Sequence, residues 1–123
     1  MGKTPAALED PTDPATGQLV ETFVFAELRR QITWADTDVT MFRWQDRAGA
    51  EVDLVLETAD GRVAGLEVKS GQTPKPEWFR WLGQMRDALG GQFVTGIALY
   101  PGNQVLPFGD RLLAVPISAL WEL

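Results

Sequence analysis

The sequence predicts an α/β fold with a mixed central β-sheet flanked by helices, and three observations support this. Near the start of the chain, apolar residues recur at spacings of three and four, the pattern of an amphipathic helix. Short runs rich in β-branched and aromatic residues follow, joined by turn sequences. A second helical pattern then stands between two strand-like runs, where a parallel strand pair needs a crossover helix. The expected order is α-β-β-β-α-β-β.

The first helix is expected after a flexible N-terminal lead-in. Residues 1–16 contain three prolines and no apolar period, so we expect residues 17–123 to form a single domain. In "GQLVETFVFAELRRQI" the apolar stripe of the helix consists of Leu19, Val20, Phe23, Val24, Leu28 and Ile32. Glu21 lies near the start of this helix, where a negative charge interacts favourably with the helix dipole.

Three strands are expected next, over 39–44, 51–57 and 63–69. The Asp-Gly dipeptide at 60–61 predicts a tight hairpin that makes the second and third strands antiparallel neighbours.

The second half of the chain begins with a helix over 77–91. Its apolar side consists of Trp78, Trp81, Leu82, Met85 and Leu89. A Gly-Gly pair ends this helix. Strands over 94–102 and 111–118 follow, and "SALWEL" predicts a final helical turn.

The composition excludes several kinds of chemistry. The chain has no cysteine and no histidine, which rules out disulfides, the usual zinc ligands and a histidine general base. No apolar run approaches the roughly 18 residues of a membrane span, so we expect a cytoplasmic protein without membrane contact. The net charge of −6 gives no support for tight nucleic-acid binding through a basic surface. Any chemistry must come from carboxylates, lysine, hydroxyls or a hard metal ion.

Charged residues interrupt the two strands of the expected hairpin. Because side chains alternate between faces, Glu67 and Lys69 share a face, and Asp53 shares one with Glu51. A turn centred on Asp60 and Gly61 places Asp53 near Val68, and a slip of one residue brings it beside Glu67 or Lys69. A bulge or bend would bring the carboxylates together, a feature common near active sites.

Two interpretations of these charges stay open. One is a divalent-metal site, in which Asp53 and Glu67 bind Mg²⁺ or Mn²⁺ and Lys69 orients a water and stabilises phosphate charge. Glu21 would add a third carboxylate if its helix packs over this face. The other is a salt-bridged solvent face of a half-exposed sheet, which the pattern alone favours. Glu51, at the outer end of its strand, is expected to be exposed rather than a ligand.

The spacing of these residues resembles the motif of the PD-(D/E)xK nucleases, with Glu21, Asp53 and "Glu67-Val68-Lys69" at the motif positions. Three longer blocks, "GQLVETFVFAELRRQ", "WQDRAGAEVDLVLETADGRVAGLEVKSG" and "LPFGDRLLAVPISALW", together resemble the C-terminal domain of prokaryotic AAA-type ATPases, a nuclease-like domain of unknown function. The resemblance implies a restriction-endonuclease-like fold. The chain contains no GxxxxGK[ST] phosphate loop, so we expect no ATP hydrolysis.

The function expected from these observations is hydrolysis of DNA phosphodiesters by a Mg²⁺-assisted water. Glu21, Asp53, Glu67 and Lys69 are the candidate catalytic residues, and Asp53 and Glu67 are the candidate metal ligands. The alternative is an inactive DNA- or protein-binding or regulatory module that is normally attached to an AAA-type ATPase. A self-associating domain is a third interpretation. The candidate partners are therefore DNA, an ATPase domain or other protein, and a second copy of the chain.

Overall fold

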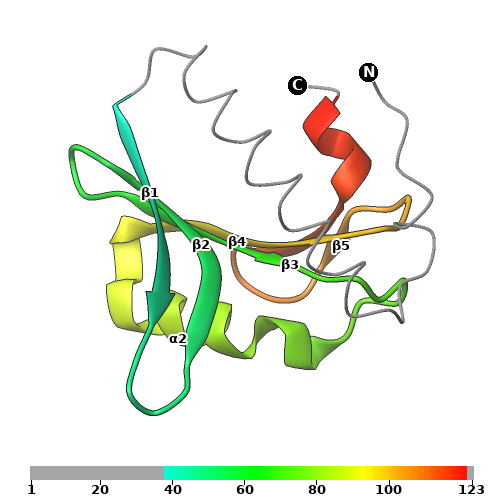
Figure 1. Cartoon of the computed structure of the whole chain (residues 1–123), viewed down its shortest axis with the longest axis horizontal. Helices are drawn as coiled ribbons and strands as arrows, with labels where there is room; N and C mark the ends of the chain where they lie inside the picture. Colours follow the sequence, from blue (N-terminus) through cyan, green and yellow to red (C-terminus); the bar gives the residue numbers. More distant parts are fainter. Residues whose placement is uncertain (1–37, 122–123) are drawn as a thin grey trace.

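The computed structural model describes residues 38–121 of the 123-residue chain. The expected lead-in, the expected first helix and Glu21 lie outside these residues. The described part is an α/β unit, in which a six-stranded mixed sheet carries one α-helix, α2, against one of its faces (Figure 1). Within residues 38–121, no helix is long and apolar enough to span a bilayer.

The strands and helices lie close to the predicted positions. In chain order they are β1 (Val39–Gln45), β2 (Glu51–Thr58), β3 (Val63–Val68), the 3-10 turn η2 (Pro76–Phe79), α2 (Arg80–Leu89), the 3-10 turn η3 (Gly90–Gln92), β4 (Phe93–Tyr100), β5 (Leu106–Pro107), β6 (Leu112–Pro116) and the 3-10 turn η4 (Ile117–Trp121). The helix expected over 77–91 is therefore an α-helix with a 3-10 turn at each end. The short strand β5 was not predicted, because two residues, one of them proline, carry no strand pattern.

The strand order in the sheet is β1-β2-β3-β4-β6-β5. The first three strands form an antiparallel meander, whereas β3–β4 and β4–β6 are parallel pairs. The predicted crossover is confirmed, since α2 lies between the parallel strands β3 and β4 along the chain. Parallel strands place their C-terminal ends at one edge of the sheet, which is where α/β proteins usually bind ligands.

The hairpin between β2 and β3 has a three-residue turn rather than a two-residue one. The Thr58 N–H donates to the Arg62 carbonyl at 3.0 Å, and Gly61 takes a positive φ of 88°, which glycine adopts without strain. The last paired residues at the far end of this ladder are Leu54 and Leu66. One further step in the same register sets Asp53 opposite Glu67, whereas a two-residue turn would have set it opposite Val68.

A β-bulge interrupts the pairing of β1 with β2 next to Asp53. Phe42 pairs with Val55 and Trp44 pairs with Val52, so three steps along β2 oppose two steps along β1. The extra residue lies in the Asp53–Leu54 segment. A bulge bends its strand and changes the direction of nearby side chains. The β2–β3 ladder itself is regular up to Leu54 and Leu66, so the length of the turn, and not this bulge, sets Asp53 opposite Glu67.

Hydrophobic clusters cover both faces of the sheet. Leu82 from α2 is fully buried in the larger cluster, together with Val55, Phe93 and Leu112. Helix α2 packs directly on the backbone of β3, because a Cβ atom on Gly65 would lie only 2.7 Å from the Leu82 side chain. The smaller cluster on the other face is built around Leu54, Leu66, Leu99 and Leu120.

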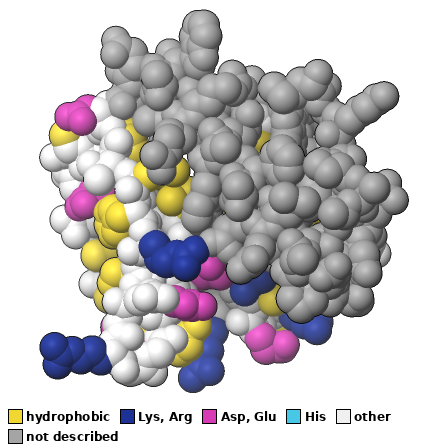
Figure 2. Space-filling model, in the orientation of Figure 1, with side chains coloured by type: hydrophobic (Ala, Val, Ile, Leu, Met, Phe, Trp, Pro, Cys, Tyr) yellow, Lys and Arg dark blue, Asp and Glu magenta, His cyan; other side chains and the backbone are white. Residues whose placement is uncertain are grey.

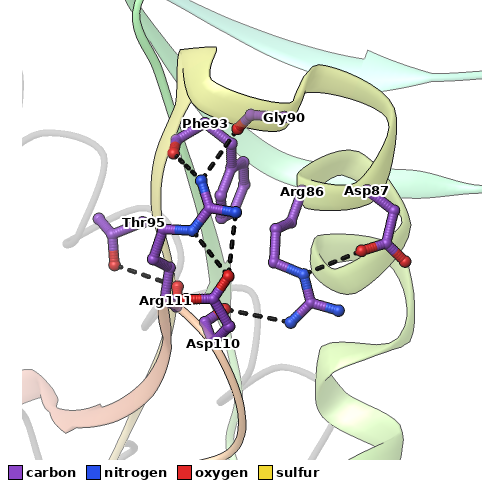
Figure 3. A network of polar contacts seen from close by, with 7 residues as sticks. All are labelled: Arg86, Asp87, Gly90, Phe93, Thr95, Asp110 and Arg111. Atoms are coloured by element: carbon purple, nitrogen blue, oxygen red, sulfur yellow. Dashed lines mark hydrogen bonds and ion pairs between the residues drawn. The ribbon is translucent and has the colours of Figure 1, made fainter.

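A polar network around Arg111 fastens the return from α2 to the sheet (Figure 3). The Arg111 guanidinium donates to the carbonyls of Gly90 and Phe93, at 2.9 and 2.6 Å, and it forms an ion pair with Asp110. The Arg111 carbonyl accepts from the Gly96 N–H at 2.8 Å. Arg111 has a φ of 59°, an uncommon value for a residue other than glycine. These contacts fix the N-terminal end of β4.

Candidate functional site

Glu67 is the only buried charged residue among those that the structure describes. It lies near the C-terminal end of β3, with a relative exposure of 4%. Gly65, two residues earlier, faces α2, so alternation places Glu67 on that same face. Its partner position in β4 is Ala98, a small residue that is itself fully buried. A carboxylate in such surroundings loses most of its hydration, which is costly unless other groups compensate.

Lys69 provides part of this compensation. Its backbone N–H donates to the Leu99 carbonyl at 2.8 Å, which holds the residue beside β4 just after β3 ends. Its Nζ lies 3.4 Å from Oε2 of Glu67, and the Lys69 side chain remains 29% exposed. The pair therefore connects a buried carboxylate with the protein surface.

Asp53 completes the part of the site that the structure describes. Its Oδ2 accepts the backbone N–H of Val68 at 2.8 Å. The β2–β3 ladder has its last pair at Leu54 and Leu66, so the Asp53 carboxylate takes the N–H of a residue beyond the end of that ladder. This contact ties the bulged segment of β2 to the C-terminal end of β3, the segment that carries Glu67.

One oxygen of Glu67 has no hydrogen-bond partner among the described residues. Within residues 38–121, Oε1 of Glu67 is the only buried side-chain oxygen or nitrogen that lacks a hydrogen bond. Leaving such an acceptor unsatisfied costs about 1–3 kcal/mol, and native proteins contain few of them. An orphaned carboxylate oxygen beside a second carboxylate is the arrangement that a bound cation would satisfy.

The charges around Glu67 also favour a bound cation. Burial, followed by the negative charge of Asp53, raises the pKa of Glu67 to about 7 from an ordinary value of 4.5, although Lys69 opposes the shift. Glu67 therefore changes its charge near neutral pH, where a group can hold or release a proton. A divalent cation near the two carboxylates would favour their ionised forms.

These residues fit a hard divalent cation as a set of two donors. Asp53 and Glu67 offer carboxylate oxygens, the ligand type that Mg²⁺ and Mn²⁺ prefer, and Mg²⁺ usually keeps several waters beside one or two carboxylates. No cluster of three or more acidic ligands occurs in the described stretch 38–121. Glu21, the predicted third carboxylate, lies outside that stretch.

The structure thus brings together three of the four predicted site residues: Asp53, Glu67 and Lys69. Glu51 is exposed, as predicted, and its carboxylate accepts from the Gln45 amide at 3.1 Å. The sequence did not reveal that Asp53 binds the backbone of Val68. No sequence pattern predicts that contact, because it depends on the bulge in β2 and on the length of the β2–β3 turn.

Comparison with protein families adds an independent result. The family described as Domain of unknown function (DUF4143) matches residues 16–120. The chain belongs to this family. The DUF4143 match includes all four predicted site residues, Glu21 among them. No curated protein matches the chain significantly. The description of the DUF4143 family names no activity, so any function must be argued from the residues themselves.

Proposed function

We propose that this DUF4143 domain is a metal-dependent nuclease of the PD-(D/E)xK type that hydrolyses phosphodiester bonds in DNA. The observation that carries the proposal is the buried Glu67, which lies beside Asp53 and Lys69 and has one oxygen without a partner in the stretch 38–121. The location supports it as well, because the C-terminal ends of parallel strands are the usual ligand-binding edge of α/β sheets.

Asp53 and Glu67 would hold Mg²⁺ or Mn²⁺, and Glu21 would supply a further carboxylate. When bound, the metal supplies Lewis acidity and lowers the pKa of a coordinated water. Lys69 neutralises part of the carboxylate charge before the metal binds. Its partly exposed side chain can also interact with a substrate phosphate, as lysines commonly do in phosphoryl chemistry.

The order of the strands and of helix α2 also supports the proposal, at the level of the fold. A meander of three strands followed by a crossover helix and a parallel strand is the arrangement expected of a restriction-endonuclease-like core. The likeness of the longer sequence blocks to the C-terminal domain of AAA-type ATPases suggests such an ATPase as the partner. In that setting the ATPase would bring DNA to the domain, which would compensate for its net charge of −6.

A second candidate is a module of the same fold that binds DNA or protein without cleaving DNA. The ion pair between Lys69 and Glu67 favours it, because the pair neutralises the buried charge without a metal. The acidic net charge favours it too, because a DNA-cleaving surface usually needs basic groups.

The test is metal binding and DNA cleavage by the full 123-residue chain. We expect millimolar Mg²⁺ or Mn²⁺ to raise the melting temperature relative to EDTA, since a ligand of the native state stabilises it. We also expect metal-dependent cleavage of end-labelled single- and double-stranded oligonucleotides. E67Q and D53N should each reduce the cleavage rate by about 100-fold. The matched control is E51Q, which alters an exposed carboxylate on the same strand and should leave cleavage unchanged.

The outcomes separate the two candidates. Metal binding that is lost in E67Q, without cleavage of any DNA substrate, would support the non-cleaving module. A chain that neither binds metal nor cleaves DNA would overturn the nuclease proposal. Cleavage that survives both E67Q and D53N would show that a contaminating nuclease is responsible.

A further inference from the structure

An apolar groove lies between strands β1–β3 and the C-terminal half of α2. Its volume is about 370 Å³. Glu57 and Val63, which pair across the β2–β3 hairpin, both line it. They lie four residues along their strands from Asp53 and Glu67, or roughly 13 Å at the usual strand rise. None of Asp53, Glu67 and Lys69 lines the groove, although Val55, two residues along β2 from Asp53, does.

The lining combines apolar and aromatic surface with one negative charge. Val55 and Val63 are buried at its base, Met85 and Leu89 line it from α2, and Trp44 lines it from β1. Glu57 and Gln84 are the polar side chains among the lining residues, and none of the described lysines and arginines lines the groove. A carboxylate beside apolar and aromatic surface is a combination that attracts organic cations.

Glu57 is exposed and, unlike most carboxylates between residues 38 and 121, has no partner within that stretch. Asp60, Asp87 and Asp110 each form an ion pair with a neighbouring arginine. Among residues 38–121, neither a hydrogen bond nor an ion pair involves the Glu57 carboxylate. Its charge is thus available to a ligand in the groove.

We propose that this groove binds a small organic cation, namely an alkyl- or arylammonium compound with an apolar body. The ammonium group pairs with Glu57 and interacts with the face of Trp44 or Phe42. The apolar body lies against Val55, Met85 and Leu89, which removes apolar surface from water. This proposal does not depend on the nuclease proposal.

The size of the groove selects a small molecule over a macromolecule. A volume of about 370 Å³ lies within the range of small-molecule sites. A stable protein interface, in contrast, is a broad surface that buries about 800 Å² on each partner. Of the three large exposed hydrophobic residues in the described part, Phe42 lines the groove, whereas Val94 and Val105 do not. On the coloured part of the surface in Figure 2, hydrophobic side chains form small groups separated by charged and other residues.

The experiment uses three probes that differ mainly in charge: 4-phenylbutylammonium, 4-phenylbutanol and 4-phenylbutyrate. Each is titrated into the full chain at low salt, and binding is followed by ¹H–¹⁵N NMR and calorimetry. We expect the ammonium probe to bind about fivefold more tightly than the alcohol, because exposed ion pairs contribute modestly, and the carboxylate to bind most weakly. E57Q should erase this order, while E51Q should preserve it.

A second variant tests the location. Ala88 lines the groove and is exposed, so Ala88→Trp should fill the cavity without disturbing the core. We expect it to weaken all three probes by about tenfold or more while the spectrum of a folded protein is retained. The proposal is overturned if the ammonium probe causes no shift at millimolar concentration. Equal binding of the three probes, an effect of E51Q equal to that of E57Q, or undiminished binding to the Ala88→Trp variant would each overturn it as well.

Discussion

The two ends of the parallel strands β3 and β4 carry polar networks of opposite character. At the N-terminal end, the guanidinium of Arg111 donates to two backbone carbonyls and pairs with Asp110 (Figure 3). At the C-terminal end, Glu67 is buried, yet one of its oxygens has no hydrogen-bond partner within the described residues. Buried polar groups that serve only stability are normally satisfied, so the unsatisfied end is the one that points to function.

The first prediction tests the stabilising end and has the largest expected effect. Arg111→Ala removes two charge-assisted hydrogen bonds and leaves a side chain with a Cβ at a φ of 59°. We expect it to lower the free energy of unfolding by about 3 kcal/mol in urea denaturation. Arg111→Gly loses the same bonds but avoids the left-handed strain, so it should be about 1 kcal/mol less destabilised than the alanine variant.

The control for this prediction is Arg47→Ala, which alters an exposed arginine in the β1–β2 turn. An exposed substitution of this kind normally changes stability by less than about 0.5 kcal/mol. If Arg111→Ala were as stable as Arg47→Ala, the hydrogen bonds of Arg111 would not contribute to the stability of the folded protein.

The second prediction concerns the C-terminal end of β3, where the contribution of Glu67 to stability should depend on pH. The folded-state pKa of Glu67 is raised to about 7, above its ordinary value of 4.5, so the folded state binds more protons than the unfolded state between these values. The contribution of Glu67 to stability is therefore fully present below pH 4.5 and is lost as the pH rises through 7. Relative to E67Q, which is neutral throughout, the natural chain should lose about 2–3 kcal/mol over this window in EDTA.

The measurement is chemical denaturation of both proteins at several pH values. E51Q serves as the comparison. It removes the exposed carboxylate of Glu51, so this variant should show the same dependence of stability on pH as the natural chain. A constant difference between the natural chain and E67Q across the window would contradict the assignment of a neutral, buried Glu67 below pH 7.

Much of the fold follows from local patterns in the sequence. The positions of β2, β3 and α2, the Asp-Gly hairpin and the parallel crossover were all predicted, because each rests on side-chain period or turn chemistry within a short window. The short strand β5 and the left-handed φ of Arg111 were not predicted. The strand β5 forms only through its pairing with β6, and the conformation of Arg111 is held by bonds to Gly90 and Phe93, which lie 21 and 18 residues earlier in the chain.

The candidate site was predictable in its residue types but not in its geometry. Two carboxylates and a lysine on strands stand out because charges are rare in a core. Whether Asp53 faces Glu67 or Val68 depends on a single residue of turn length, and a one-residue slip reverses the face of every side chain. The turn ends at Gly61 with three residues and β2 carries a bulge, and sequence alone specifies neither.

The last prediction separates the causes of the Glu67 shift and has the smallest expected effect. D53N removes a negative charge while its amide oxygen can still accept the Val68 N–H, so the pKa of Glu67 should fall. Lys69→Met removes the positive charge that opposes the shift, so the pKa should rise. Each change should amount to about one pH unit or less, measured from the ¹³C carboxyl resonance of Glu67 in EDTA. If both variants moved the pKa in the same direction, burial or local rearrangement would control it rather than these neighbouring charges. Glu67 would then be an isolated desolvated carboxylate, rather than one of two interacting carboxylates, Asp53 and Glu67, that a cation could bridge.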